Sequence, residues 1–210
     1  MIYRHEKNPP AGPVELYPTK TASLMSVMSE YLTGRGLSFA CACENSWYPT
    51  DELDDIPRLV IPATNIAGTR FWQARAMIDV PDRLRWKSAK GARGEAVVIC
   101  WPPTLRGRTK IVVVEGPLDA LAVATSNNIG IAAMGKANVG GVINYLKNEY
   151  SYKLMFRDLP VIVVPDLDAI EFGGRAVAEL ALAGISAKIR VPPYEDLAAL
   201  TVEEREELLR

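Results

Sequence analysis

Short apolar runs alternate with helical patterns in the second half of the chain. The runs IVVV, GIAAM, VIVV and AKIRV occupy residues 111–114, 130–134, 161–164 and 187–191. An uninterrupted run of β-branched residues is typical of a strand buried on both faces, because a half-buried strand alternates apolar and polar positions. Apolar residues at helical spacing predict helices between these runs, at 117–126, 139–148 and 172–183, with Leu180 and Leu182 in the core. Strands that alternate with helices predict a mostly parallel, Rossmann-like α/β sheet with helices on both faces.

The first half has a different pattern, which predicts a smaller mixed α+β unit. Apolar spacing over 22–32 indicates a short amphipathic helix, and RLVIPA and RFWQARAM indicate two strands of a hairpin that turns through Gly68. EAVVIC predicts a further strand, and prolines and polar residues at 102–108 mark a boundary. We therefore expect an extended arm (1–21), a basic subdomain (22–107), the α/β domain (108–198) and a C-terminal helix (199–210). The C-terminal helix is expected to be exposed, with Thr201 and Glu204 as a capping box and with charges that only solubilise it.

Composition bounds the class of protein. The chain has 210 residues and is 49% hydrophobic, which is enough for a packed core. No apolar run approaches the roughly 18 residues of a membrane span, and residues 1–18 lack the apolar centre of a signal peptide. We therefore expect a cytoplasmic protein that makes no membrane contact.

The cysteines do not predict a metal site or a disulfide framework. Cys41, Cys43 and Cys100, with the single histidine His5, do not match the spacing of a zinc ribbon. We predict no zinc, and we interpret the C-x-C pair as two small residues in or near a strand.

Charge is distributed unevenly along the chain. The net charge of −1 is composed of −4 over residues 1–57, +8 over 58–110 and −5 over 111–210. A basic block followed by an acidic block suggests a polyanionic partner and a cation site in one molecule. A merely solvated surface would produce the same balance, so the asymmetry needs support from specific residues.

Acidic residues follow the apolar runs where the expected strands end. Glu115 comes directly after one run, and Asp166 and Asp168 follow another. Asp119 lies one helical turn beyond Glu115, and Asp196 follows the last run. Because ligands of parallel sheets bind at the carboxyl ends of the strands, we expect these carboxylates to meet at one edge.

A cluster of like charges destabilises the fold unless a cation neutralises it. Carboxylate oxygens suit Mg²⁺ or Mn²⁺, which keep several waters and share their coordination with substrate phosphates. The alternative is that each acid caps the N-terminus of a helix, where negative charge is favoured. For Asp119 and Glu195 the two interpretations are equally supported, whereas Glu115 and the D-x-D pair follow buried strands and favour a metal site.

These residues carry a family resemblance. VVVEGPLDALA, followed some fifty residues later by VIVVPDLDAIEFGGRAVAEL, resembles the Toprim domain of DnaG-type primases, topoisomerases, certain nucleases and recombination proteins. Upstream, YLTGRGLS, RLVIPATNIAGTRFWQAR and LRWKSAKG are similar to the segments that precede this domain in DnaG-type primases. The resemblance covers roughly residues 29–198 and implies a Toprim fold behind a basic primase-type subdomain.

The resemblance also implies roles for individual residues. Glu115, Asp166 and Asp168 would form the catalytic, metal-holding core, with Asp119 and Asp196 as outer or second-metal ligands. Glu115 would alternatively accept the hydroxyl proton, and the sequence does not separate the two roles. The implied activity is nucleotidyl transfer with Mg²⁺ or Mn²⁺, which makes short RNA primers from ribonucleoside triphosphates on single-stranded DNA.

The basic block supplies candidates for binding phosphate. Arginine suits phosphate oxygens, and phosphate contacts dominate affinity for nucleic acids. The predicted nucleotide- and DNA-binding residues are Arg58, Arg75, Arg85, Lys87, Lys90 and Lys136. Trp72 and Trp86 lie among them and either stack on bases or belong to the core, with the core favoured. Near the D-x-D pair, Gly173 and Gly174 are expected to permit close approach to its turn, and Arg175 to pair with an acid of the cluster or to contact phosphate.

The chain departs from the family pattern in three ways. It has no cysteine and histidine set for a zinc-binding module, and it ends at Arg210 without a helicase domain, so either would be a separately encoded partner. The lysine that usually precedes the last acid is absent before Asp196. These departures keep open a Toprim nuclease or a non-catalytic, nucleic-acid-binding replication accessory protein.

Overall fold

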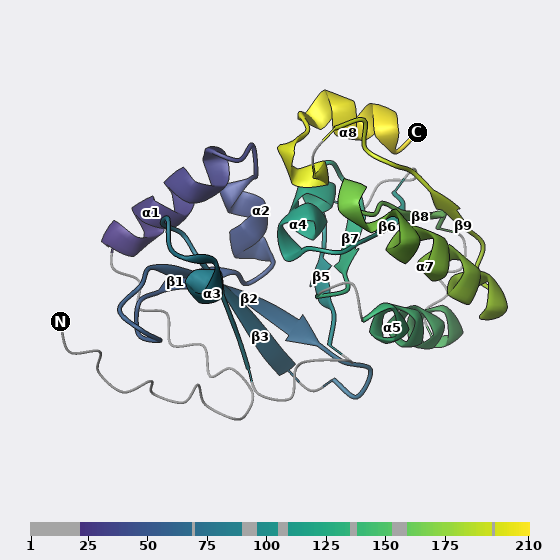
Figure 1. The fold of residues 1–210 in the computed structure, drawn as a ribbon, viewed down its shortest axis with the longest axis horizontal. Coiled ribbons are helices and arrows are strands. Elements are labelled where there is room, and N and C mark those ends of the chain that lie inside the picture. Colours follow the sequence, from purple (N-terminus) through teal and green to yellow (C-terminus); the bar gives the residue numbers. More distant parts are fainter. Residues whose placement is uncertain are drawn as a thin grey trace.

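The computed structural model describes residues 22–68, 70–89, 96–104, 109–134, 138–152, 159–194 and 196–210. They form two sheets that lie side by side, with helices covering both (Figure 1). One sheet has four strands in the order β1-β2-β3-β4, and the other has five in the order β5-β7-β6-β8-β9. The mixed α/β class expected from the sequence is confirmed. The expected arm at 1–21 lies outside the described residues.

The four-stranded sheet is antiparallel and belongs to the N-terminal part. Its strands are β1 (Tyr48–Thr50), β2 (Arg58–Thr64), β3 (Arg70–Ala76) and β4 (Trp86–Ser88). The β2–β3 pair is the hairpin predicted from RLVIPA and RFWQARAM, with Arg58 opposite Ala76 and Thr64 opposite Arg70. Helices α1 (Ala22–Thr33), α2 (Phe39–Glu44) and α3 (Asp82–Arg85) complete this part.

The five-stranded sheet is mostly parallel, as predicted. Its strands are β5 (Val98–Cys100), β6 (Ile111–Val114), β7 (Ile129–Ala132), β8 (Val161–Val163) and β9 (Ala187–Ile189). All neighbours run parallel except β5 and β7. β5 precedes the boundary expected at 102–108, yet it pairs in this second sheet and so ties the N-terminal part to it.

Helices cover both faces of the five-stranded sheet. α4 (Pro117–Thr125) packs on one face, and α5 (Val139–Tyr152) and α7 (Ile170–Leu182) pack on the other. The strand residues alternate between the two cores: Val112 and Val114 face α4, whereas Ile111 and Val113 face α5 and α7. None of the helices in the described ranges has the length and apolar character required to cross a membrane.

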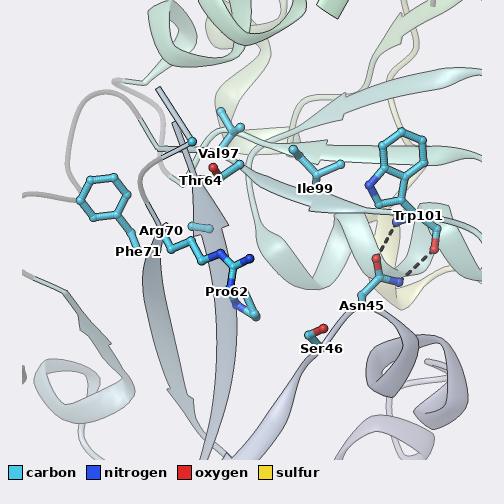
Figure 2. Close-up of a pocket in the computed structure, with 11 residues that line it drawn as sticks. Asn45, Ser46, Pro62, Thr64, Arg70, Phe71, Val97, Ile99 and Trp101 are labelled. Carbon is cyan, nitrogen blue, oxygen red and sulfur yellow. Dashed lines mark hydrogen bonds between the residues drawn. The ribbon is translucent and has the colours of Figure 1, made fainter. Parts of the chain in front are cut away.

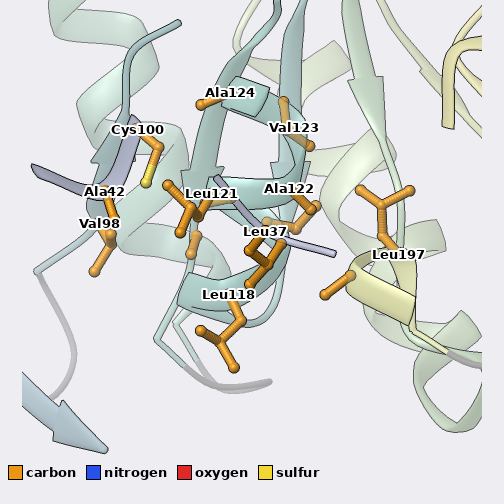
Figure 3. Close-up of a cluster of buried hydrophobic side chains, with 14 of the residues drawn as sticks. Leu37, Ala42, Val98, Cys100, Leu118, Leu121, Ala122, Val123, Ala124 and Leu197 are labelled. Carbon is orange, nitrogen blue, oxygen red and sulfur yellow. The ribbon is translucent and has the colours of Figure 1, made fainter. Parts of the chain in front are cut away.

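The core on the α4 side joins the two halves of the chain. Leu37 and Ala42 from the N-terminal part lie among Leu118, Leu121 and Ala122 of α4 (Figure 3). Each of these side chains is at most 7% exposed. Burial of this apolar surface, at about 25 cal/mol per Å², is the main term that holds the two parts in a fixed arrangement.

Two local predictions are wrong. Cys41 and Cys43 lie in helix α2 and not in a strand, although Cys41 packs in the same core cluster as Val98 and Cys100 of β5. The helix starts after Ser38, whose side chain accepts a hydrogen bond from the Cys41 N–H (3.1 Å). Leu182, expected in the core, is 90% exposed, whereas Leu180 is fully buried. Residues two apart on a helix point to different sides, so only one of these leucines can face the sheet.

The C-terminal segment forms the short helix η2 (Leu197–Ala199) and α8 (Val202–Leu208). Thr201 and Glu204 form the capping box predicted at the start of α8. The charges of this helix are not only solubilising, because Arg205 is fully buried. Its guanidinium donates hydrogen bonds to backbone oxygens at 3.2–3.4 Å, those of Leu197, Ala122, Gly36 and Ala198. Arg205 therefore connects α8 to α4 and to the N-terminal part.

Candidate active site

The turn from β6 into α4 positions the first two carboxylates. Glu115 follows the last residue of β6 and is 5% exposed, and Asp119 lies in the first turn of α4 and is 6% exposed. Asp119 turns back toward Gly116: a Cβ added at Gly116 would lie 2.7 Å from Asp119 Oδ2. A larger residue at 116 would displace the Asp119 carboxylate, which explains the glycine in the E-G-P turn.

Asp119 also connects this turn to the last acidic segment. Its Oδ1 accepts a hydrogen bond from the Ala198 N–H (2.9 Å), which holds η2 against α4. Asp196 is the residue directly before η2 and is exposed. The hydrogen bond therefore brings Asp196 to the end of α4 where Asp119 lies.

The charges of two neighbouring carboxylates act on Asp119. The pKa of Asp119 is raised from 3.8 to about 7, chiefly by burial; the charges of Asp166 and Asp196 contribute to this rise, and the hydrogen bond from the Ala198 backbone opposes it. Acids that follow two other strands, β8 and β9, thus act on this one buried group. The structure thus places Asp166 and Asp196 within electrostatic reach of Asp119, and the roles predicted for these acids stay predictions.

The D-x-D pair lies beyond the carboxyl end of β8. Asp166 is half-buried and precedes the short helix η1 (Leu167–Ala169), in which Asp168 is exposed. Gly173 of α7 makes room here, because a Cβ at this position would lie 2.8 Å from Pro165 Cγ. The close approach that we predicted for the glycine pair is thus confirmed at Gly173. Gly174 faces open space.

The donor set fits a hard divalent cation. Within the described ranges, no three Asp, Glu, His or Cys side chains form a group that could hold a metal ion as they stand. Mg²⁺ needs only one or two carboxylates when waters and substrate phosphates fill the remaining positions. Asp119 with Asp166 or Asp196 meets that requirement, and their mutual repulsion is what a cation would relieve. The assignment of these residues as metal ligands therefore remains a prediction, and the arrangement of the carboxylates is compatible with it.

This repulsion predicts a pH-dependent response to metal. Folding raises the pKa of Asp119, so the folded chain holds the proton of this carboxyl more tightly than the unfolded chain does. The stabilisation by the protonated group is complete below about pH 4 and is lost as the pH rises through about 7. A divalent cation bound beside the ionised Asp119 should recover the lost stability. At saturating Mg²⁺ we expect the melting temperature to rise by roughly 5–10 °C at pH 8 and hardly at all at pH 5. Differential scanning fluorimetry checks this.

The matched variant for this test is Asp119→Asn, which keeps the size of the side chain and removes its charge. It should lower the Mg²⁺-induced shift at pH 8 and raise the stability of the metal-free chain at that pH. An equal shift at both pH values, or one that Asp119→Asn leaves unchanged, would contradict the proposed repulsion.

Three arginines and two acids, Glu30 and Asp79, line a hollow of about 680 Å³ beside α1 and β3, here called the basic hollow for its arginines. Arg75 is held there by a hydrogen bond from Nε to Tyr31 Oη (2.7 Å) and lies over the ring of Trp86, 4.9 Å from its centre. Arg85 also lines the hollow and forms an exposed ion pair with Asp82 (2.6 Å). Arg35, which sequence reasoning did not select, is a third arginine on this wall and lies over the Tyr31 ring.

Two of the predicted phosphate-binding residues share an internal carboxylate. Arg58 is fully buried and donates to Asp54 Oδ1 and Oδ2 (both 2.7 Å) and to the Leu84 carbonyl (2.8 Å). The prediction that Arg58 binds phosphate is therefore corrected: its burial and its pairing with Asp54 make it part of the fold. Lys87 Nζ lies 3.2 Å from the same carboxylate and is partly accessible. The predicted Lys90 and Lys136 lie outside the described residues.

Trp72, Arg175 and Arg205 lie in different environments in the folded chain. Trp72 is 3% exposed and belongs to the core, as favoured. Arg175, considered as a partner of the acidic cluster, pairs instead with Glu179 (2.6 Å) on the surface of α7. Arg205, which sequence reasoning missed, lies near enough to Asp119 for its charge to be felt. A buried arginine in a charged terminal helix leaves no signal in the sequence.

Comparison with known proteins identifies the fold. No protein-family model matches the chain, and no curated protein sequence matches it. Among solved structures, the primase fragment of the bacteriophage T7 primase-helicase protein superposes with a TM-score of 0.57 at 18% identity, over 97% of this chain and 81% of the fragment.

A second solved structure agrees. In bacteriophage T7, primase domains that interact with the lagging-strand DNA polymerase are bound to an RNA/DNA hybrid and dTTP, and they superpose with a TM-score of 0.51 at 22% identity. The match covers 79% of this chain and 80% of that one. The chain therefore has the fold of a phage primase core, which confirms the fold that the sequence resemblance implied.

Proposed function

We propose that the protein is a metal-dependent primase core that synthesises short RNA primers on single-stranded DNA. The observation that carries this proposal is the convergence of Asp119, Asp166 and Asp196 at one edge of a parallel sheet, in a fold shared with the T7 primase fragment. The basic hollow lies in the part of the chain that precedes this sheet. The two together offer a cation site and a phosphate site.

The chemistry would be nucleotidyl transfer. A 3′-hydroxyl attacks the α-phosphate of a ribonucleoside triphosphate, a new phosphodiester bond forms, and pyrophosphate leaves. Bound Mg²⁺ or Mn²⁺ would supply positive charge at the attacking and leaving oxygens. Glu115, Asp166 and Asp168 would hold the cations, and Asp119 and Asp196 would complete the set. Glu115 would alternatively accept the hydroxyl proton, since it follows the last residue of β6 and lies one helical turn before Asp119.

Template and triphosphate would be held by the N-terminal part. Arg75 is fixed between Tyr31 and Trp86, so little side-chain entropy is lost when it binds phosphate. That the T7 domains are bound to an RNA/DNA hybrid and dTTP supports nucleic acid and nucleotide as partners here. A zinc-binding module would help to select the template, and a helicase is a further possible partner.

The function is tested by a primer-synthesis assay. The protein is incubated with single-stranded DNA, labelled ribonucleotides and Mg²⁺ or Mn²⁺, and the products are separated by length. Short labelled products that disappear on addition of EDTA support the proposal. Cleaved template without extension would indicate the nuclease alternative, and binding without products the accessory role; either result contradicts a primase.

The phosphate-binding role of the hollow predicts a salt-dependent defect. Arg75→Ala should weaken binding of single-stranded DNA about tenfold and lower the slope of affinity against salt by about one charge. Lys87→Ala should weaken it less, because Lys87 is partly neutralised by Asp54. Fluorescence anisotropy over a salt series measures both. Lys188→Ala, on the exposed strand β9, is the charge-matched control. If Arg75→Ala binds single-stranded DNA with unchanged affinity and unchanged salt dependence, Arg75 does not bind phosphate.

A further inference from the structure

A second hollow, separate from the carboxylates and from the basic hollow, lies where the two sheets meet. It has a volume of about 470 Å³ and opens between β2–β3 and β5 (Figure 2). None of its lining residues belongs to the acidic cluster. A volume in this range suits a small organic ligand.

The backbone of β5 turns its hydrogen-bonding groups toward this hollow at alternate residues. In β7, Ile129 and Ala133 donate their N–H groups toward β6, so Gly130 and Ala132 face β5. The opposing residues of β5 are Cys100 and Val98, which therefore bond to β7. By the same alternation, Val97, Ile99 and Trp101 direct their N–H and C=O groups outward, away from the sheet.

Two of these three outward residues are already paired. Val97 exchanges both backbone hydrogen bonds with Thr64 of β2 (2.7 and 2.9 Å). Trp101 donates its N–H to Asn45 Oδ1 (2.7 Å) and accepts from Asn45 Nδ2 (2.9 Å), so a side-chain amide takes the place of a strand (Figure 2).

The middle residue remains open. Among the described residues, no hydrogen-bond partner is found for the outward N–H and C=O of Ile99. Continuation of the Thr64–Val97 pairing would place Pro62 opposite Ile99. Pro62 has no N–H to donate, which explains why the two sheets separate at this point and leave a hollow.

Side chains around the outward N–H and C=O of Ile99 add a positive charge and an aromatic surface. The Arg70 guanidinium extends into the hollow near Pro62, and the Trp101 indole lies at the other end, beyond Ile99 (Figure 2). Arg70 is exposed, and no ion pair or hydrogen bond of its side chain is found within the described part of the chain. The hollow thus combines a neutral donor–acceptor pair with a cationic group.

We propose that this hollow, here called the junction pocket, binds a mononucleotide: the base pairs with the backbone of Ile99 beside Trp101, and the phosphate binds Arg70. A nucleobase edge carries a donor next to an acceptor, which matches the N–H and C=O of one strand residue. An extended peptide fits less well, because strand addition needs a row of open groups, and Thr64 and Asn45 occupy the positions on either side.

The site would act beside the proposed primase activity and does not depend on it. It offers no carboxylate for catalysis, so its occupant is an effector or a stored nucleotide and not the reacting one. Binding at the junction pocket should therefore persist without divalent cations, whereas nucleotidyl transfer should not.

The test is equilibrium dialysis of labelled AMP against the full chain in EDTA. Arg70→Gln should weaken AMP binding about tenfold, because a hydrogen-bonded charge pair is lost. Ile99→Pro removes the outward N–H, replaces the side chain that lines the pocket, and should weaken binding at least to a similar degree. Lys188→Gln, a charge removed from the opposite edge strand, should bind AMP as the parent does. Ribose 5-phosphate, which lacks the base, should bind at least tenfold more weakly than AMP.

Several results would refute the proposal that the junction pocket binds a mononucleotide. No binding at millimolar AMP, equal binding by Arg70→Gln, or equal binding of ribose 5-phosphate would each do so. Loss of AMP binding in Arg75→Ala but not in Arg70→Gln would place the nucleotide in the basic hollow instead. If Ile99→Pro fails to fold, as judged by its melting curve, Arg70→Gln and ribose 5-phosphate still decide. Loss of primer synthesis with AMP binding retained would refute the primase and leave the pocket standing.

Discussion

Asp166→Ala and Asp168→Ala are each expected to lower primer synthesis about a thousandfold, the effect of removing a group that stabilises charge in a transition state. Asp166 lies directly beyond β8, where its charge is felt by the buried Asp119. The fold should survive, because Asp166 is half-buried and Asp168 exposed. Loss of a carboxylate that repels Asp119 should even raise the stability of the metal-free chain.

The measurement is the rate of short-product formation with Mg²⁺, together with a melting curve for each variant. Glu206→Ala, an exposed acid on α8, is the matched control and should keep the activity of the parent. Activity within a few-fold of the parent in both aspartate variants would show that the D-x-D pair takes no part in the reaction.

Arg205→Ala is expected to lower the free energy of unfolding by about 3–5 kcal/mol, the usual cost of breaking a buried charged network. Arg205 is fully buried, and the substitution removes donors from the carbonyls of Leu197, Ala198, Ala122 and Gly36. The carbonyls of Leu197, Ala198 and Ala122 would be left without those bonds in the buried interior. The positive charge near Asp119 would also be lost, which should raise the pKa of Asp119 further.

Urea unfolding followed by circular dichroism measures this loss. Arg205→Lys keeps the charge but not the planar, multi-donor geometry, and it should recover only part of the stability. Arg210→Ala, an exposed arginine at the end of the same segment, should change stability by less than 0.5 kcal/mol. Equal stability of Arg205→Ala and Arg210→Ala would show that the buried guanidinium does not hold α8 in place.

The sequence predicted the larger features because they rest on strong periodic signals. The runs IVVV and VIVV gave the central strands β6 and β8, and the E-G-P turn placed Glu115 at a strand end. The meeting of Asp119, Asp166 and Asp196 followed from parallel strands sharing one carboxyl edge. Thr201 and Glu204 predicted a capping box through local backbone bonding, which needs no tertiary information.

What the sequence did not predict depends on tertiary contacts. Arg58 and Arg205 read as surface charges, and only the folded chain shows that each lies among buried carbonyls or carboxylates. Ser38 is an ordinary N-cap and could have predicted helix α2, but the cysteines that follow it resembled strand residues. The junction pocket depends on Pro62 lying near an edge strand more than thirty residues away, a relation that no local pattern carries.

The central claim is that the carboxyl edge of the parallel sheet holds divalent cations through its carboxylates. Crystals grown with Mn²⁺ and a ribonucleoside triphosphate test it most directly by anomalous scattering. The account predicts a Mn²⁺ peak within about 2.5 Å of carboxylate oxygens from the group formed by Glu115, Asp119, Asp166, Asp168 and Asp196, at ligand distances typical of oxygen donors. Ordered triphosphate with no manganese peak at these side chains, or a peak only elsewhere on the molecule, would contradict it.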